Sequence, residues 1–98
     1  MPAAVILEFE GVTEQQYDAV NEKLGLDPKS GKGDWPDGLR NHMAGRTDDG
    51  GLFVSEVWDS PEHQAAFMES RLGAALAEVG VPAPVRVTWA EVVAHHSP

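Results

Sequence analysis

The sequence of 98 residues predicts one α+β domain, in which a four-stranded antiparallel sheet carries two helices on one face. Three observations lead to this prediction. Four segments show the alternation or the apolar runs typical of strands, and two segments between them show the spacing of amphipathic helices. Their order along the chain is β-α-β-β-α-β, which is the ferredoxin-like arrangement.

The first strand is expected over residues 3–10, where an apolar run passes into an alternating pattern. The helix that follows is expected to begin after Thr13, a good N-cap, because Gln16 stands three residues later as in a capping box. Gly25 is suited to end that helix. Its apolar stripe has the helical spacing i, i+3, i+7: Tyr17, Val20 and Leu24.

The stretch 27–38, DPKSGKGDWPDG, is expected to be irregular because it holds three glycines and two prolines. Trp35 lies in its middle. A large aromatic residue in such a polar segment either fastens the loop to the core or forms a lid over a pocket, and both alternatives remain open from sequence.

Two strands, 39–46 and 52–58, are expected to form a hairpin with an Asp-Gly turn signal between them. The length of its loop decides which side chains share a face. A loop of two or four residues would put Asn41 on the face of Trp58, whereas a loop of three or five residues would put His42 there. The sequence leaves this register open.

The second helix is expected to be capped by Asp59 or Ser60 and to bend or break near Gly73. The last strand is expected over 85–93. Residues 94–98 are expected to form a flexible tail of this single domain, which spans 1–98.

Composition excludes several classes of function. A net charge of −9 and seven scattered basic residues argue against nucleic acid or an anionic membrane as a partner. No cysteine is present, so disulfide and thiolate chemistry are excluded, in keeping with a bacterial cytoplasm. The N-terminal residues lack the features of a signal peptide, and no stretch approaches the ~20 apolar residues of a membrane span. We expect a cytoplasmic protein without a metal site, because no histidine pair has zinc-ligand spacing.

The segment FVSEVWDSPEHQAAF, 53–67, and the order of elements resemble the dimeric α/β barrel superfamily and, within it, antibiotic-biosynthesis-monooxygenase-like proteins. The resemblance implies a homodimer packed through the open sheet face, with a cavity in each protomer between the sheet and the helices or loops. Apolar residues on the second face also call for a partner surface. The family includes cofactor-independent oxygenases of aromatic polyketides, haem-degrading enzymes, cyclases and isomerases.

The resemblance also bears on cofactors. Haem-degrading members carry a histidine in the second helix, whereas this sequence reads AAFMES at 65–70 and has its helical histidine, His63, in the first turn. No cofactor is therefore expected. Trp58 matches the strand-end tryptophan of the family.

His42 is the candidate catalytic residue, because it is the histidine inside a predicted strand and could accept a proton from a phenol or an enol. A hydrogen-bonded structural histidine is the alternative. Aromatic walls for a ligand, or core residues, are Trp58 and Trp35. Polar strand residues that could bind a substrate, or simply form salt bridges, are Asn41, Glu56 and Arg86.

These observations predict a small-molecule-binding homodimer that takes a small hydrophobic or aromatic ligand. If it is an enzyme, the expected reaction is cofactor-independent monooxygenation of an aromatic or enolisable substrate. The alternatives are a non-catalytic ligand-binding or interaction module, and a polyketide-type cyclase or isomerase.

Overall fold

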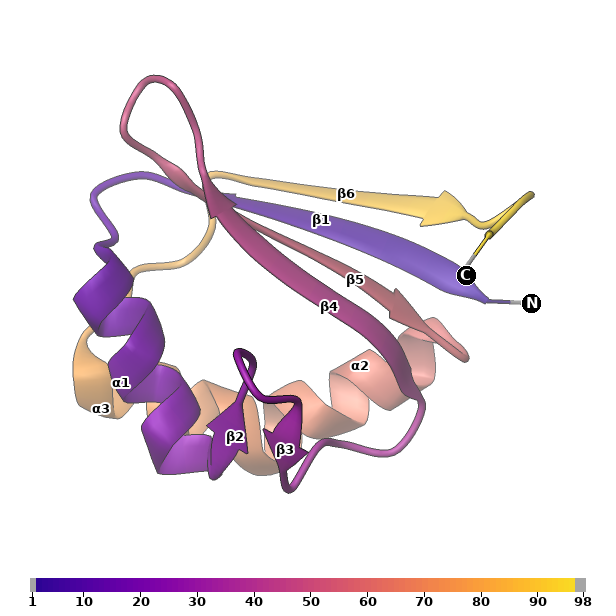
Figure 1. The fold of residues 1–98 in the computed structure, drawn as a ribbon, viewed down its shortest axis with the longest axis horizontal. Coiled ribbons are helices and arrows are strands. Elements are labelled where there is room, and N and C mark those ends of the chain that lie inside the picture. The colour runs from indigo at the N-terminus through magenta and orange to yellow at the C-terminus, as the bar shows by residue number, and fades with distance from the viewer. Residues whose placement is uncertain (1, 97–98) are drawn as a thin grey trace.

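The computed structural model describes residues 2–96 and has the predicted α+β, ferredoxin-like arrangement (Figure 1). The main sheet has the order β4-β5-β1-β6, and all of its neighbours are antiparallel. Its strands are β1 (Ala3–Phe9), β4 (Leu39–Arg46), β5 (Leu52–Trp58) and β6 (Arg86–Glu91). The helices are α1 (Glu14–Leu24), α2 (Pro61–Phe67), η1 (Met68–Leu72) and α3 (Gly73–Val79).

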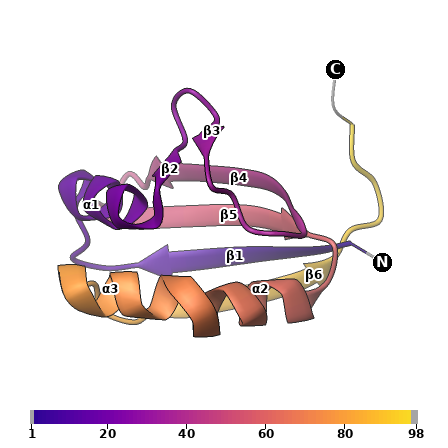
Figure 2. The same cartoon turned by 90° about the horizontal axis from the view of Figure 1, so that it is seen from below.

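All helices lie on one face of the sheet, as the two views show (Figures 1 and 2). The core is formed where they meet it, and its members are apolar residues of the inner sheet face and of the helices: Val5, Leu7, Phe9, Val20, Leu24, Leu52, Val54, Trp58 and Phe67. The opposite face of the sheet leaves Ile6 and Met43 exposed.

The predicted start and end of α1 are confirmed. Thr13 Oγ1 accepts the backbone N–H of Gln16 at 3.1 Å, and Gln16 Oε1 accepts the backbone N–H of Thr13 at 2.9 Å. Gly25 ends the helix with a φ of 74°, a left-handed conformation that glycine adopts without strain.

The second helical stretch is continuous, and Ser60 is its N-cap. Gly73 does not break it; its N–H bonds to Met68 O, five residues back, and so closes the π-helical turn η1. A Cβ at Gly73 would lie 2.9 Å from that carbonyl oxygen, so the turn needs a glycine there. The wider turn lies where Met68 and Leu72 reach the cavity described below.

The stretch 27–38 is not wholly irregular, and the prediction was wrong on this point. The short strands β2 (Leu26–Asp27) and β3 (Lys32–Gly33) pair in a two-stranded hairpin. Asp27 organises its turn by accepting hydrogen bonds from the backbone of Lys29 at 3.1 Å and from Ser30 Oγ at 2.7 Å. Gly33 has a φ of 123° and no room for a Cβ, so this pairing depends on glycine.

The hairpin of β4 and β5 has a five-residue loop, 47–51, and its register pairs His42 with Glu56. Paired residues share a face, so His42, Glu56 and Trp58 all lie on the helix-covered side. Of the two alternatives, the loop of three or five residues is therefore the one observed. Asn41 pairs with Val57 on the other face.

The ends of two predicted strands differ slightly from those observed. β1 ends at Phe9 rather than at residue 10, and β6 covers 86–91 rather than 85–93. Within the predicted tail, residues 94–96 have no helix or strand, and residues 97–98 lie outside the part of the chain that the structure describes.

Candidate functional site

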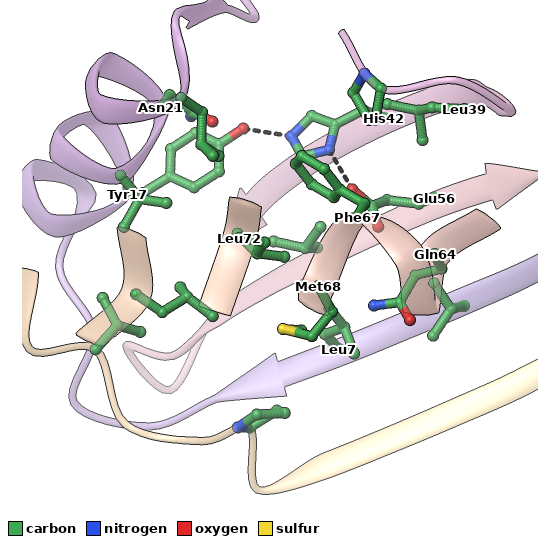
Figure 3. A pocket seen from close by; sticks show the side chains of 18 of the residues that line it. Leu7, Tyr17, Asn21, Leu39, His42, Glu56, Gln64, Phe67, Met68 and Leu72 are labelled. Carbon is green, nitrogen blue, oxygen red and sulfur yellow. Dashed lines mark hydrogen bonds and ion pairs between the residues drawn. The ribbon is translucent and has the colours of Figure 1, made fainter. Parts of the chain in front are cut away.

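A cavity of about 210 Å³ lies between the inner face of the sheet and the helices. Its wall is mostly apolar and comes from α1, the second helical stretch, all four strands of the main sheet and the segment around Trp35 (Figure 3). Besides two tryptophans, five residues with polar side-chain groups interrupt this wall: Tyr17, Asn21, His42, Glu56 and Gln64.

Three of these five residues form a hydrogen-bonded chain. Tyr17 Oη lies 2.5 Å from His42 Nε2, and His42 Nδ1 lies 2.8 Å from Glu56 Oε2 (Figure 3). The chain continues behind the wall, where Trp58 Nε1 donates to Glu56 Oε1 at 3.1 Å. A helix, an edge strand and an inner strand thus contribute successive members.

The direction of each hydrogen bond in this chain follows from Trp58, the residue at its buried end. An indole N–H can only donate, so Glu56 accepts from Trp58 with one oxygen, and its other oxygen accepts from His42 Nδ1–H. The neutral imidazole then has its lone pair on Nε2, where it accepts the hydroxyl hydrogen of Tyr17. Glu56 therefore fixes both the orientation and the tautomer of His42.

The ring of His42 is closely surrounded. Its side chain is 12% exposed and that of Glu56 is 9% exposed. The ring of Tyr17 lies nearly parallel to it, at 8° and 6.0 Å between centres, and the ring of Trp35 lies 5.6 Å away at 49°. These contacts limit the rotation of the imidazole and hold Nε2 toward the phenol.

Tyr17 is a weaker acid here than in water. Burial raises the pKa of its phenol above 10, the Asn21 amide opposes this, and the negative charges of Glu56 and Asp18 raise the pKa further. The phenol therefore stays protonated at neutral pH. It can pass its hydrogen to His42 only when it receives another one.

The predicted site residues are divided between the cavity and other places. His42, Glu56 and Trp35 line the cavity. Trp58 is completely buried behind Glu56 and packs against Phe67, with 5.9 Å between ring centres. It therefore supports the wall rather than forming it.

Asn41 and Arg86 lie away from the cavity wall. Asn41 is exposed on the open face, because strand residues alternate between faces and its neighbour His42 points inward. Arg86 is exposed at the start of β6, where its Nε lies 3.7 Å from Glu8 Oε2. In this geometry both side chains belong to the protein surface.

Trp35 is fastened and also belongs to the wall. Its Nε1–H donates to Gly31 O at 3.1 Å, which ties it to the β2–β3 hairpin. Its ring faces His42 across the cavity edge. The geometry thus agrees with a residue that holds the loop down while it closes one side of the cavity.

Tyr17, Asn21 and Gln64 were not among the predicted site residues. Asn21 extends the apolar stripe of α1, because it lies four residues after Tyr17 and three before Leu24. It is 7% exposed, and within residues 2–96 its Nδ2 has no hydrogen-bond partner. A polar residue on a buried helical stripe was the signal in the sequence that could have identified it.

Neither a metal-binding cluster nor a membrane-spanning helix is found among residues 2–96. Within residues 2–96, no group of three or more histidine, aspartate or glutamate side chains is arranged to hold a metal ion. In the same part of the chain, every helix is too short or too polar to span a bilayer.

No family model matches the sequence, and none of the curated proteins matches it significantly. The similarity lies in the fold. A proposed antibiotic biosynthesis monooxygenase from Chloroflexus aurantiacus superposes with a TM-score of 0.69 at 20% identity, over 99% of this chain and 98% of that one. The protein Rv0793 from Mycobacterium tuberculosis gives 0.66 at 24% identity, over 99% and 100%.

A proposed antibiotic biosynthesis monooxygenase from Deinococcus radiodurans also shares the fold, with a TM-score of 0.55 at 13% identity, over 99% of this chain and 96% of the other. The structural neighbours are thus antibiotic-biosynthesis-monooxygenase-like proteins with a ferredoxin-like fold, as the resemblance in sequence predicted. At these identities the likeness establishes the fold alone, and the function has to be argued from the cavity.

Proposed function

We propose that the cavity binds a small aromatic or enolisable ligand and that His42, acting through Tyr17, accepts a proton from it. One observation carries this proposal: the hydrogen-bonded chain of Tyr17, His42 and Glu56 ends at an otherwise apolar cavity. An apolar pocket with a few convergent polar groups is typical of a small-molecule site.

The size of the cavity limits the ligand. Its volume of about 210 Å³ is below the range of most drug-sized sites, roughly 300–1,000 Å³. A cavity of about 150 Å³ is sufficient for benzene. A ligand with one or two fused rings therefore fits this cavity better than a polycyclic one.

The proposed proton transfer begins at Tyr17, the member of the hydrogen-bonded chain that meets the ligand. The ligand hydroxyl would donate to Tyr17 Oη, whose own hydrogen already points to His42 Nε2. Transfer of both hydrogens leaves a ligand anion, a neutral phenol and an imidazolium. Glu56 accepts from Nδ1–H at 2.8 Å and stabilises that positive charge.

A cofactor-independent monooxygenation would follow from the ligand anion. Such an anion can transfer one electron to O2, and the ligand radical that results can combine with the superoxide formed. Loss of water then converts an activated CH2 of the ligand to C=O. One oxygen atom enters the ligand, and the other leaves as water with the two hydrogens lost. The shared fold with proposed antibiotic biosynthesis monooxygenases supports this choice by analogy.

The test combines binding with product analysis. Purified protein is titrated with one- and two-ring phenols and enolisable ketones that carry an activated CH2 while tryptophan fluorescence is followed. Each mixture is then kept under ¹⁸O2 and examined by mass spectrometry. We expect saturable quenching and one labelled oxygen in the product. His42→Ala should lower the rate about 10²–10⁴-fold, while His63→Ala, which changes an exposed helical histidine, should leave it unchanged. Full activity of His42→Ala would refute the catalytic role.

Other outcomes of this test distinguish the alternative functions. Saturable binding without a new product would favour a ligand carrier or a non-oxidative cyclase or isomerase. Absence of binding across the panel would favour an interaction module, in which His42 and Glu56 serve only to stabilise the hairpin.

Self-association is a separate part of the proposal. The open face of the sheet exposes Ile6 and Met43, which a second copy of the chain would cover. We expect a dimer by sedimentation at micromolar concentration and a monomer for Ile6→Glu. A monomeric wild type would exclude this assembly.

A further inference from the structure

The formal charges around the cavity are of one sign. The chain has seven lysine and arginine residues, all of them within the described part, and none of them lines the cavity. Four of them form ion pairs with acids, namely Lys23, Arg40, Arg71 and Arg86. The other three are exposed, namely Lys29, Lys32 and Arg46. A ligand in the cavity therefore meets no lysine or arginine side chain at its wall.

One carboxylate supplies the charge of the wall. Glu56 accepts the N–H of His42 with one oxygen and the N–H of Trp58 with the other, so neither oxygen carries a hydrogen and the group is ionised. His42 is neutral, because its Nε2 accepts the hydroxyl hydrogen of Tyr17. Among the described residues that line the cavity, Glu56 is the single acidic one, and its side chain is only 9% exposed. The wall thus carries one negative charge without a cation beside it.

Charged groups outside the wall do not offset this charge. Arg71 of η1 has its guanidinium carbon 5.3 Å from the centre of the Phe67 ring and donates to Leu24 O at 2.8 Å. It also lies 3.6 Å from the carboxylate of Asp34, so its positive charge is already matched by an acid. Asp18 of α1 adds a further negative charge, which contributes to the raised pKa of the neighbouring Tyr17 phenol. The surroundings therefore disfavour a second anion in the cavity.

We propose that the cavity takes up its ligand only as the uncharged acid, so that the hydrogen which His42 accepts is one that the ligand itself carries in. The ligand class narrows from aromatic or enolisable compounds in general to phenols and enols that lack a carboxylate or phosphate group. This inference rests on the proposed ligand-binding function and adds the ionisation state in which the ligand binds.

Uptake of the uncharged acid keeps the charge of the site constant. Before the proton transfer, the site holds the carboxylate of Glu56 alone. After it, a ligand anion, the imidazolium of His42 and the same carboxylate again sum to one negative charge. A ligand that arrives ionised would place two negative charges in a mostly apolar cavity, where charges repel each other more strongly than in water. It would also bring no hydrogen for His42 to accept.

Two one-ring probes of similar size test the inference. 4-Nitrophenol ionises near neutral pH, whereas 4-nitroanisole carries a methyl group in place of that hydrogen and cannot ionise. Calorimetry measures the dissociation constants of both probes on either side of the pKa of 4-nitrophenol. The measurements use two buffers that differ in ionisation enthalpy, so that the protons taken up on binding are counted. Tyr17 stays protonated over this range, because burial raises its pKa above 10.

We expect 4-nitroanisole to bind with an affinity that does not change with pH. Above the pKa of 4-nitrophenol, the affinity for this probe should fall about ten-fold per pH unit, and about one proton should be taken up for each molecule bound. The absorbance of the bound probe then shows where the hydrogen resides. A nitrophenolate band together with this uptake means that the hydrogen has passed to Tyr17 and His42.

The variant Glu56→Gln removes the charge to which the exclusion is attributed. In this variant the affinity for 4-nitrophenol should fall less steeply above the pKa of the probe, and the proton uptake should drop below one. Glu91→Gln removes an exposed carboxylate of β6 that does not line the cavity, and it should behave as the wild type. Unchanged binding of 4-nitroanisole shows that the cavity of each variant is intact.

Three results would contradict the inference, and they differ in what survives. If the wild type binds 4-nitrophenol equally well on both sides of its pKa and takes up no proton, while 4-nitroanisole binds, the cavity accepts the ion and only the proposed ligand site remains. If Glu56→Gln keeps the pH dependence of the wild type, the role assigned to this carboxylate is refuted. If neither probe binds to the wild type, the inference fails together with the proposed function.

Discussion

The two edge strands of the sheet, β4 and β6, present side chains to the same cavity in opposite surroundings. On β4, His42 is covered by Tyr17 and Trp35 and has both ring nitrogens paired. On β6, Val87 and Trp89 also line the cavity, yet they are 49% and 41% exposed. An edge strand can hold a buried polar network only where other elements cover it. The cavity wall is partly exposed at β6 and carries its hydrogen-bonded polar residues at β4.

The largest expected effect compares Trp58 of β5, which lies behind the covered side of the cavity, with Trp89 of β6, which lines its exposed side. Trp58→Ala removes a completely buried ring that packs on Phe67 and should lower the free energy of unfolding by about 3–5 kcal/mol. Trp89→Ala removes a ring that is already half in solvent and should cost about 1 kcal/mol or less. Urea unfolding followed by circular dichroism measures both changes. Equal losses would mean that the wall of β6 is as closely packed as that of β5.

A smaller effect is expected for Glu56 of β5, the carboxylate that accepts a hydrogen bond from His42 of β4 on the covered side. Glu56→Gln keeps the shape but replaces one accepting oxygen by an NH2 group, which then meets an N–H of His42 or Trp58. We expect a loss of about 1–3 kcal/mol in the free energy of unfolding, typical of an unpaired buried donor. Glu91→Gln, on the exposed strand β6, is the matched control and should stay within about 0.5 kcal/mol. A loss for Glu91→Gln as large as for Glu56→Gln would contradict the difference between the walls.

Most of the fold could be predicted because it depends on local patterns. The strand of 52–58 follows from residues close together in the sequence, and so do the capping box of Thr13 and Gln16 and the left-handed glycine after α1. The prediction was wrong for residues 27–38, because composition alone did not reveal that Asp27 folds a turn that lets two short strands pair.

The site could be predicted only in part, because its geometry depends on contacts between distant segments. His42 and Glu56 are paired by a hairpin register that a loop of two or four residues would have reversed. Tyr17 belongs to the apolar stripe of its helix, and no local pattern shows that this stripe meets β4 at His42. Asn21 was recognisable as a polar residue on that stripe, but its missing partner is a property of the folded chain.

The titration of Tyr17, which covers His42 of β4, also reports on this side of the cavity. Tyr17 is the single tyrosine of the chain, so the absorbance of tyrosinate reports on it alone. Burial and the charge of Glu56 raise its pKa, so we expect its midpoint above 10 in the folded protein. Glu56→Gln removes that charge and should lower the midpoint. Because the folded pKa is the higher one, this group's contribution to stability is present below pH 10 and is lost as the pH rises through the folded value. A midpoint equal to that of the unfolded chain would mean that solvent reaches the phenol freely.

The smallest expected effect concerns the two surface ion pairs that flank the walls. Arg40 of β4 is hydrogen-bonded to Asp59, and this bond holds the pKa of that carboxyl below 3.8. A lowered folded pKa stabilises the protein above the unfolded value, and this contribution is lost as the pH falls below 3.8 through the folded one. Asp59→Asn should therefore lower the thermal midpoint at pH 7 and leave it equal to the wild type near pH 2. The effect at pH 7 should be slight, because screening by solvent keeps an exposed pair weak.

The pair of Arg86 with Glu8, at 3.7 Å beside β6, serves as the control, and Glu8→Gln should have no measurable effect at either pH. If the difference for Asp59→Asn persisted to pH 2, the carboxylate would act through something other than its charge, and the contact of β4 with the start of α2 would owe nothing to this ion pair.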